Sequence, residues 1–253
     1  MNINFLIQNI KSTKSFFPKI SDRIKYVGFI YGLLKKEIEL LIKFRYGLLK
    51  VRVRNNNGSD AFILGEVLKQ NCYDISNFTG IDCKTIVDLG ANCGYTSLYL
   101  SMKYPNAEVV AVEPVPNNTN QIETHIRINK LERVRLFPNA IGATDGTAYI
   151  HYIDKDYGHQ ITDIPNNNPI SVVSIPTIMK EMNWNEIDFL KIDIEGYEEV
   201  LLKQNTQWLE KVNNIVIEIH ENYTSEDLDE LAKKYDFLPP QDISGNYFLT
   251  KNK

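Results

Sequence analysis

Cysteine is scarce in this chain: only Cys72, Cys83 and Cys93 occur among 253 residues. They form no CxxC pair and no regular spacing, which argues against a disulfide framework and favours a reducing compartment. The opening stretch, MNINFLIQNIKSTKSFF, lacks an apolar core behind a basic start and lacks a small-residue cleavage site. We therefore expect no signal peptide and a cytoplasmic, or membrane-peripheral, location.

Long apolar runs are also missing. The densest apolar stretch, Val27–Phe44, is interrupted by Lys35, Lys36, Glu37 and Glu39, whereas a membrane-spanning helix needs about 20 mostly apolar residues. Residues 1–50 have an irregular helical pattern, and within them we expect Val27–Phe44 to form an amphipathic helix. Such a helix lies on a membrane surface or, more commonly, against the core of the protein.

Basic residues are in excess only near the N-terminus. Residues 1–54 contain 12 Lys and Arg against 3 Asp and Glu, whereas the remaining residues contain 16 against 29, so the balances are +9 and −13. This asymmetry indicates a contact with something anionic, such as a membrane, or a helical appendage docked on an acidic domain. No nucleic-acid partner is expected. We divide the chain at the Asn55–Gly58 turn into a basic, mainly helical extension, 1–54, and a main domain, 55–253.

From Thr85 onward, short apolar segments alternate with longer amphipathic ones. We expect strands at Thr85–Leu89, Glu108–Val112, Arg133–Phe137, Asp188–Asp193 and Asn214–His220. We expect helices at Asp60–Gln70, Thr96–Tyr104, Pro116–Asn129, Glu195–Lys203 and Ser225–Lys234, the last capped by Ser225. Such alternation predicts a parallel sheet with helices on both faces.

Further strands are expected within this series, between its third and fourth strands, and after its end. Tyr235–Leu238 and Tyr247–Thr250 flank a turn and predict a terminal antiparallel hairpin, and Gly146–Ile153 and Ile170–Ile175 have the pattern of extra strands. The predicted fold class is therefore α/β: a doubly wound, mostly parallel seven-stranded sheet with a terminal antiparallel hairpin and a helical N-terminal appendage.

The turn after the first expected strand has the composition of a ligand site. Asp88–Gly94, with the sequence DLGANCG, closes a strand and opens a helix, at the sheet edge where open α/β folds bind ligands. Gly90 allows a tight turn close to a ligand, and Gly94 allows the next helix to sit against the sheet. The backbone amides there suit a carboxylate, and Asp88 suits an ammonium group.

A carboxylate at the end of the second expected strand narrows the choice of cofactor. Glu113 follows Gly90 by 23 positions and can accept hydrogen bonds from two ribose hydroxyls, as S-adenosylmethionine (SAM) and NAD both require. A dinucleotide fingerprint needs a middle glycine for the pyrophosphate, and Asn92 stands there instead. We therefore expect SAM, with an NAD-dependent oxidoreductase as the rival enzyme.

The chain resembles the FkbM-type methyltransferases, a branch of the Rossmann-like SAM-dependent enzymes. The resemblance runs from about residue 59 to residue 221 and rests on the strings IVDLGANCGYTSLYL (86–100), VVAVEPVPNN (109–118), NAIGATDGTAYI (139–150), VVSIPTIMKE (172–181), DFLKIDIEGYEEVLL (188–202) and IVIEIHE (215–221). It implies methyl transfer, usually to oxygen, and a glycan or natural-product pathway. The first 50 residues match no pattern of this family.

The resemblance also assigns residues to roles. Asp88, Gly90, Asn92 and Gly94 fall on the first SAM motif, with the amide of Ala91 inside the turn, and Glu113 falls on the ribose-binding acid, followed by Pro114. Asn139 and Ala140 fall where such enzymes line the adenine pocket. Asp193 and Glu195 fall on the acidic motif after the fourth expected strand, and Glu218 and His220 fall on the motif that ends the fifth.

The reaction site is expected where the fourth and fifth strands end, because their carboxyl ends meet at the ligand edge of the sheet. His220 is the expected general base, since an unperturbed pKa of about 6.5 suits neutral pH, with Asp193 or Glu218 to orient it. Structural alternatives are that Glu195 begins a helix and that Glu218 pairs with Lys191.

A divalent metal is a competing use of Asp193, Glu218 and His220, but we do not favour one, because no tight ligand spacing occurs. Of the other histidines, His125 and His151 are expected to be structural or on the surface, and His159 is a weak candidate for contact with the acceptor.

Together these observations predict a SAM-dependent methyltransferase, and the resemblance implies a hydroxyl of a sugar or glycan-type molecule as the acceptor. Natural-product, lipid and peptide hydroxyls remain alternatives. The non-enzymatic alternative is a scaffold with the SAM-binding fold that docks on a membrane or a partner protein. The intact set of Gly90, Gly94 and Glu113 argues against it, because a scaffold has no need of them.

Overall fold

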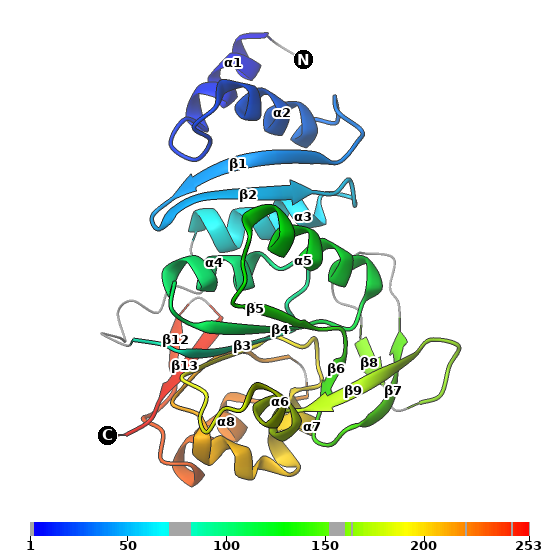
Figure 1. The fold of residues 1–253 in the computed structure, drawn as a ribbon, viewed down its shortest axis with the longest axis vertical. Coiled ribbons are helices and arrows are strands. Elements are labelled where there is room, and N and C mark those ends of the chain that lie inside the picture. Colours follow the sequence, from blue (N-terminus) through cyan, green and yellow to red (C-terminus); the bar gives the residue numbers. More distant parts are fainter. Residues whose placement is uncertain are drawn as a thin grey trace.

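A twisted sheet of seven strands, in the order β12-β13-β11-β10-β3-β4-β5, forms the centre of the protein (Figure 1). The computed structural model describes residues 3–70, 82–151, 160–162, 164–220, 222–243 and 245–252. The strands of this sheet are β3 (Thr85–Leu89), β4 (Glu108–Val112), β5 (Val134–Phe137), β10 (Phe189–Ile192), β11 (Asn214–Glu218), β12 (Gln241–Ile243) and β13 (Asn246–Thr250). The first five are parallel, and β13 runs antiparallel to both β11 and β12.

Helices cover both faces of the sheet, which confirms the doubly wound α/β fold (Figure 1). They are α3 (Ser59–Leu64), which continues as a π-helix over Gly65–Gln70, α4 (Tyr95–Lys103), α5 (Pro116–Asn129), α6 (Ile175–Met182), α7 (Glu198–Lys203), a 3₁₀ helix at Thr206–Lys211 and α8 (Ser225–Lys234). Alternate residues of β3 enter different cores: Ile86 packs with α4, whereas Val87 packs with α6, α7 and α8. This period of two follows from the pleat and explains why the strands are apolar on both faces.

The N-terminal region contains two helices and a hairpin. The helices are α1 (Ile3–Ser12) and α2 (Ile20–Ile30), and β1 (Ile38–Phe44) pairs antiparallel with β2 (Gly47–Val53) in a two-stranded sheet of its own. The prediction of one helix over Val27–Phe44 is therefore wrong. Ile38, Leu40 and Ile42 alternate with exposed residues, and pairing with β2 turns this alternation into a buried strand face.

The hairpin is packed into the main domain. Its buried side chains share one apolar cluster with the helix α4 and with the sheet residues Ile86 and Val109. Figure 1 shows the resulting order of layers: α1 and α2 lie outermost, the hairpin comes next, and α4 and α5 separate it from the sheet. Residues 38–53 thus complete the core above α4, and only α1 and α2 extend beyond it.

A second, four-stranded sheet lies beside the main one, in the order β6-β9-β7-β8 (Figure 1). Its strands are β6 (Ala140–Gly142), β7 (Gly146–His151), β8 (Gln160–Thr162) and β9 (Pro169–Ser174). The two extra strands predicted from the sequence, Gly146–Ile153 and Ile170–Ile175, correspond to β7 and β9. His159 lies outside the described residues.

Two local expectations near the C-terminus are wrong. The strand that pairs with β13 is β12, whereas Phe237 makes only a single bridge, with Lys251. The N-cap of α8 is Thr224, not Ser225: its side chain accepts from the amide of Asp227, whose carboxylate accepts from the amide of Thr224. This reciprocal capping box satisfies two amides at once and decides the helix start.

Candidate active site

The turn that follows β3 leaves no room for side chains at its two glycines. Gly90 has φ +69°, and a Cβ there would lie 1.8 Å from the carbonyl oxygen of Asp193. Gly94 has φ +84°, and a Cβ there would lie 2.9 Å from Ile122 of α5. The glycines are thus needed for backbone conformation and for close approach, although Gly94 makes room for α5 rather than for the sheet.

Glu113, at the end of β4, holds this turn by hydrogen bonds. Its Oε2 accepts from the amide of Asn92 (2.9 Å), and its Oε1 accepts from the amide of Val115 (3.0 Å) and from Nδ2 of Asn118 (3.1 Å). Burial raises the pKa of Glu113, and these three bonds oppose the rise. Since a carboxylate accepts about four hydrogen bonds, one position is left for a ribose hydroxyl, where the sequence predicted two.

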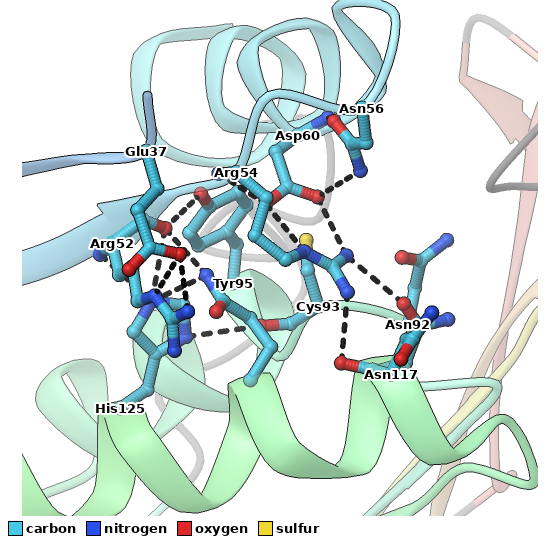
Figure 2. A network of polar contacts seen from close by, with 12 residues as sticks. Glu37, Arg52, Arg54, Asn56, Asp60, Asn92, Cys93, Tyr95, Asn117 and His125 are labelled. Carbon is cyan, nitrogen blue, oxygen red and sulfur yellow. Dashed lines mark hydrogen bonds and ion pairs between the residues drawn. The ribbon is translucent and has the colours of Figure 1, made fainter. Parts of the chain in front are cut away.

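A half-buried arginine, Arg54, joins the N-terminal hairpin to Asp60 and to the start of α5 (Figure 2). The guanidinium of Arg54, just after β2, binds both carboxylate oxygens of Asp60, at 2.9 and 2.7 Å. It also donates to the carbonyl of Asn117 (2.8 Å) and to Oδ1 of Asn118 (3.0 Å), the residue that donates to Glu113. Asp60 is fully buried. The chain of contacts from Asp60 to Glu113 therefore fixes the carboxylate that holds the turn.

Sequence reasoning gave Arg54 and Asp60 no role. Asp60 was only the first residue of an expected helix, and a basic residue beside a turn of asparagines is no recognisable signal. His125, by contrast, is structural as predicted: it is buried, it accepts from the amide of Arg52 (3.0 Å), and its other nitrogen lies 3.0 Å from the carbonyl of Cys93 (Figure 2). Burial lowers the pKa of His125 to about 4, so its ring is neutral.

A buried lysine lies beneath the turn. Nζ of Lys191 in β10 donates to the carbonyls of Leu89 (3.0 Å) and Gly90 (2.8 Å) and lies 3.3 Å from Asp88 and 3.5 Å from Asp193. Burial by itself lowers the pKa of Lys191, but Asp193 and Asp88 outweigh it and raise the pKa, so the lysine is a cation. A pairing with Glu218 was the structural alternative; the structure pairs Lys191 with Asp88, its direct neighbour on the adjacent strand, and with Asp193.

Asp88 is fully buried, and its carboxylate is occupied within the protein. Oδ1 faces Lys191, and Oδ2 accepts from the hydroxyl of Ser97 at 2.6 Å. It is absent from the lining of the cavity above the turn. In this structure the ammonium group that Asp88 meets is therefore that of Lys191.

A cavity of about 410 Å³ opens at the carboxyl ends of β3, β10 and β11. One wall is the turn itself, Gly90–Asn92, and the floor holds Lys191. All four residues predicted for the reaction site line it together: Asp193, Glu195, Glu218 and His220. α3 and the π-helix also line the cavity, through Phe62, Ile63, Glu66 and Val67. The sequence predicted a helix there but gave these residues no place in the site.

His220 is held by two carboxylates. Nδ1 lies 2.9 Å from Oε1 of Glu198, and Nε2 lies 3.6 Å from Oε2 of Glu195. The hydrogen bond with Glu198 raises the pKa of His220 to about 9, against the effect of burial. His220 is therefore an imidazolium at neutral pH in this arrangement and donates hydrogen bonds, whereas its expected role as base presumed an ordinary pKa.

Glu198 is the orienting residue that sequence reasoning missed. It is fully buried at the start of α7, and its Oε1 also lies 3.4 Å from the amide of Ile194 and 3.3 Å from that of Gly196. The helix was expected to begin at Glu195, but Glu195 and Gly196 have φ of +56° and +99° and form a turn instead. This turn points Glu195 toward the cavity and puts Glu198 in the first turn of the helix.

Carboxylates outnumber cations around the cavity. Burial is the largest cause that raises the pKa of Glu195, Glu218 and Glu66, and the charge of Asp193 adds to it in each. The cations that line the same space are Lys191 and His220. Such an excess of negative charge in a partly buried space favours a positively charged ligand.

The same groups could hold a divalent metal. Among the described residues, Asp193, Glu195 and His220 offer ligand atoms within 4.8 Å of one another. This trio differs from the predicted one, because Glu195 replaces Glu218. Oxygen and imidazole ligands of this kind suit Mg²⁺, Mn²⁺ or Zn²⁺.

A second cavity of about 400 Å³ adjoins the first through Glu195. The small sheet forms much of it, and its lining is His151, Ile161, Thr162, Ile164, Asn166, Glu195, Gly196 and Asn222. His151 is exposed, as predicted for a surface residue, but it also lines this space. Glu195 is therefore the side chain that both cavities share.

Six of the nine residues predicted for the cofactor site line neither cavity: Asp88, Gly94, Glu113, Pro114, Asn139 and Ala140. Pro114 directly follows Glu113, Asn139 follows β5, and Ala140 begins β6 and is buried. Their assignment to the cofactor remains a prediction.

Among the described helices, none is both long enough and apolar enough to cross a bilayer.

Known proteins resemble this chain over the region just described. It matches the family described as methyltransferase FkbM domain over residues 88–239. It is 25% identical over 182 residues to Methyltransferase 1 of Beauveria bassiana, covering 62% of this chain and 72% of that protein. It is 27% identical over 195 residues to Methyltransferase sdnD of Sordaria araneosa, covering 63% of this chain and 74% of that protein.

One solved structure supports the fold in particular. Methyltransferase FkbM from Methylobacillus flagellatus KT matches with a TM-score of 0.53 at 18% identity, over 70% of this chain and 46% of that one. The chain thus corresponds to less than half of that solved protein. The family match itself covers more than half of this chain and spans the glycine turn, Glu113, and Asp193, Glu195 and Glu218 of the cavity. The chain belongs to the methyltransferase FkbM domain family.

Proposed function

We propose that this protein is a SAM-dependent methyltransferase that transfers a methyl group to a hydroxyl of a sugar or glycan-type acceptor. The observation that carries the proposal is the acidic cavity directly above the glycine turn. A negatively charged, partly buried space at a sheet edge suits a ligand with cationic centres. Natural-product, lipid and peptide hydroxyls are the alternative acceptors.

The residues present fit this cofactor. The turn lines the cavity through Gly90, Ala91 and Asn92, and Gly90 places no side chain in it. Glu113 would hold a ribose hydroxyl, and the carboxylates of the cavity would offset the positive charge. When bound, SAM supplies a methyl group on a positively charged sulfur. Asn92 in place of the middle glycine supports SAM over a dinucleotide.

Glu195 is the proposed proton acceptor. It is the side chain shared by both cavities, so a hydroxyl that enters from one and a methyl donor held in the other meet beside it. Burial raises its pKa, which makes it a stronger base than an exposed glutamate. The Glu195 carboxylate would accept the proton that the acceptor hydroxyl gives up. The imidazolium of His220 forms an ion pair with Glu195 at 3.6 Å and would hold it in place.

The second cavity supports a neutral, hydroxylated acceptor. Its polar lining consists mainly of groups that both donate and accept hydrogen bonds, from His151, Thr162, Asn166 and Asn222. Its described lining residues include no lysine or arginine, the side chains that most often bind a phosphate group.

Calorimetry and a transfer assay test this function in sequence. SAM should bind to the purified protein, and NADH should not. Labelled SAM should then transfer its methyl group to neutral sugars or glycans with free hydroxyls, and Glu195→Gln should abolish that transfer. Binding of NADH alone would overturn the cofactor assignment. Binding of SAM with transfer only to peptide, lipid or polyketide hydroxyls would overturn the acceptor assignment.

A metal-assisted reaction is a second candidate, favoured by the grouping of Asp193, Glu195 and His220. A metal would lower the pKa of the acceptor hydroxyl and replace the base. Chelation should then abolish activity, and Mg²⁺ or Mn²⁺ should restore it. Unchanged activity after chelation supports the role of Glu195.

A further inference from the structure

Exposed apolar side chains are concentrated on the two N-terminal helices and the segment that follows them. Of the fourteen large apolar side chains that are exposed in the described part of the chain, nine belong to its first 34 residues. They are Ile3, Phe5, Ile7, Ile20, Ile24, Ile30, Tyr31, Leu33 and Leu34. Single exposed apolar residues are ordinary, but a concentration of this kind marks an interaction surface.

The exposed charge of the same segment has one sign. Its six lysines, all exposed, are Lys11, Lys14, Lys19, Lys25, Lys35 and Lys36. The only acidic residue up to position 36, Asp22, is buried, and its Oδ2 accepts from the amide of Leu41 at 3.1 Å. The surface therefore presents apolar side chains among positive charges, with no exposed carboxylate between them.

The outermost helix has little in the protein to stabilise it. No residue of α1 is buried, although the helix is strongly amphipathic in sequence, and its ring contact with α2 is Phe5 against Tyr31 at 5.6 Å. Figure 1 places α1 at the far end of the molecule, beyond α2 and the hairpin. An isolated helix of about ten residues is marginal in water, so α1 gains most from a surface that buries its apolar side.

We propose that residues 3–36, called here the N-terminal face, dock on an anionic membrane surface. Apolar side chains at the boundary of the acyl region, with lysines at the level of the headgroups, are how interfacial helices bind such membranes. A second copy of the chain fits less well, because two such faces would bring their lysines together. The proposal concerns a surface remote in sequence from the active-site cavity and does not depend on the acceptor.

Vesicle sedimentation with the full-length protein tests the proposal. The protein should sediment with vesicles of equal parts phosphatidylglycerol and phosphatidylcholine, and much less with phosphatidylcholine alone. High salt should weaken the binding, because it shortens the screening length from about 8 Å to about 3 Å. Comparable binding to both vesicle types, or none to either, would overturn the proposal.

Two sets of variants separate the charge from the apolar contribution. Lys11→Gln/Lys14→Gln/Lys19→Gln should weaken binding about a hundredfold, at about fivefold for each lysine near the membrane. Phe5→Asn/Ile7→Asn/Ile24→Asn should abolish it while thermal unfolding is unchanged, since these side chains are exposed. The matched control is Lys180→Gln/Lys211→Gln/Lys233→Gln, which removes three exposed lysines elsewhere.

The control variant should bind like the parent. If it loses as much affinity as the N-terminal triple variant, net charge rather than the N-terminal face drives binding. Sedimentation of the protein without vesicles tests the remaining occupant, which is a second copy of the chain. If the protein sediments as a dimer, and the Phe5, Ile7 and Ile24 changes dissociate that dimer, this face binds a second copy and the proposal is overturned.

Discussion

The glycine turn and the acidic cavity lie at the same edge of the sheet, but their polar groups are satisfied in different ways. At the turn, Glu113 accepts three hydrogen bonds and Lys191 meets two carbonyls and two carboxylates. Across the cavity, Glu195 and Glu218 are partly buried with raised pKa values.

We infer from this difference that the turn and the cavity have separate roles. Groups whose hydrogen bonds are met within the protein hold one geometry, which suits binding. Glu195 and Glu218 instead face the cavity with pKa values raised by burial and by the charge of Asp193, and titratable groups of this kind are common where proton transfer takes place. Loss of the first kind should therefore affect cofactor affinity and folding, whereas loss of the second should affect turnover.

Gly90→Ala should have the largest effect on the turn. A methyl group there would overlap the Asp193 carbonyl, and the residue has a positive φ, so we expect a loss of more than about 2 kcal/mol in stability and of measurable SAM binding. Gly146→Ala is the matched control, since a Cβ there meets nothing within 4 Å. Thermal unfolding and calorimetry would measure both. Near-normal SAM affinity in a folded Gly90→Ala protein would contradict this view of the turn.

Glu195→Gln should show the opposite pattern. Turnover should fall about 10²–10⁴-fold, because the proton acceptor is lost, while SAM affinity stays nearly unchanged. Glu199→Gln provides a control, since Glu199 is exposed and pairs with Lys203. If Glu195→Gln weakens SAM binding and leaves turnover intact, the two regions do not divide binding and chemistry in this way.

Arg54→Lys should sharpen the description of the turn. A lysine keeps the charge but cannot make the paired contacts with Asp60 together with those to Asn117 and Asn118. We expect SAM to bind about tenfold more weakly, a change of about 1.4 kcal/mol, with turnover at saturation preserved. Arg52→Lys is the control, because the side chain of Arg52 pairs with Glu37 instead. Equal losses in both variants would mean general destabilisation of the hairpin.

The pH dependence should show the smallest but most diagnostic effect. With Glu195 as base and His220 as a cation, activity should rise through the acidic range and fall as His220 loses its proton near pH 9. Glu198→Gln removes the hydrogen bond that raises this pKa, so the falling limb should move to lower pH. An activity that instead rises through about pH 9 would make neutral His220 the base.

The same titration has a consequence for stability. Because the pKa of His220 is raised above its value of about 6.5 in an unfolded chain, its stabilising contribution is complete below pH 6.5. This contribution is lost as the pH rises through about 9. Thermal unfolding between these values should therefore show a decrease that is smaller in Glu198→Gln.

Much of the fold could be predicted from local pattern. The bounds of β3, β4 and α5 agree with the expected segments residue for residue, because buried strands and a helix that begins with proline have strong local signals. The order of these units then placed Asp193, Glu195, Glu218 and His220 at one edge. Their meeting in one cavity needed no information beyond parallel topology.

The remaining features depend on contacts between segments far apart in sequence. Whether Ile38–Phe44 is helix or strand was decided by its partner β2, and the charge state of His220 was decided by Glu198, 22 positions away and buried at the start of α7. Lys191 pairs with Asp88 because the register of β10 and β3 makes the two residues neighbours. The sequence by itself determined which residues reach the ligand edge of the sheet. Only the tertiary structure decided their protonation and their partners, because burial and pairing distances set both.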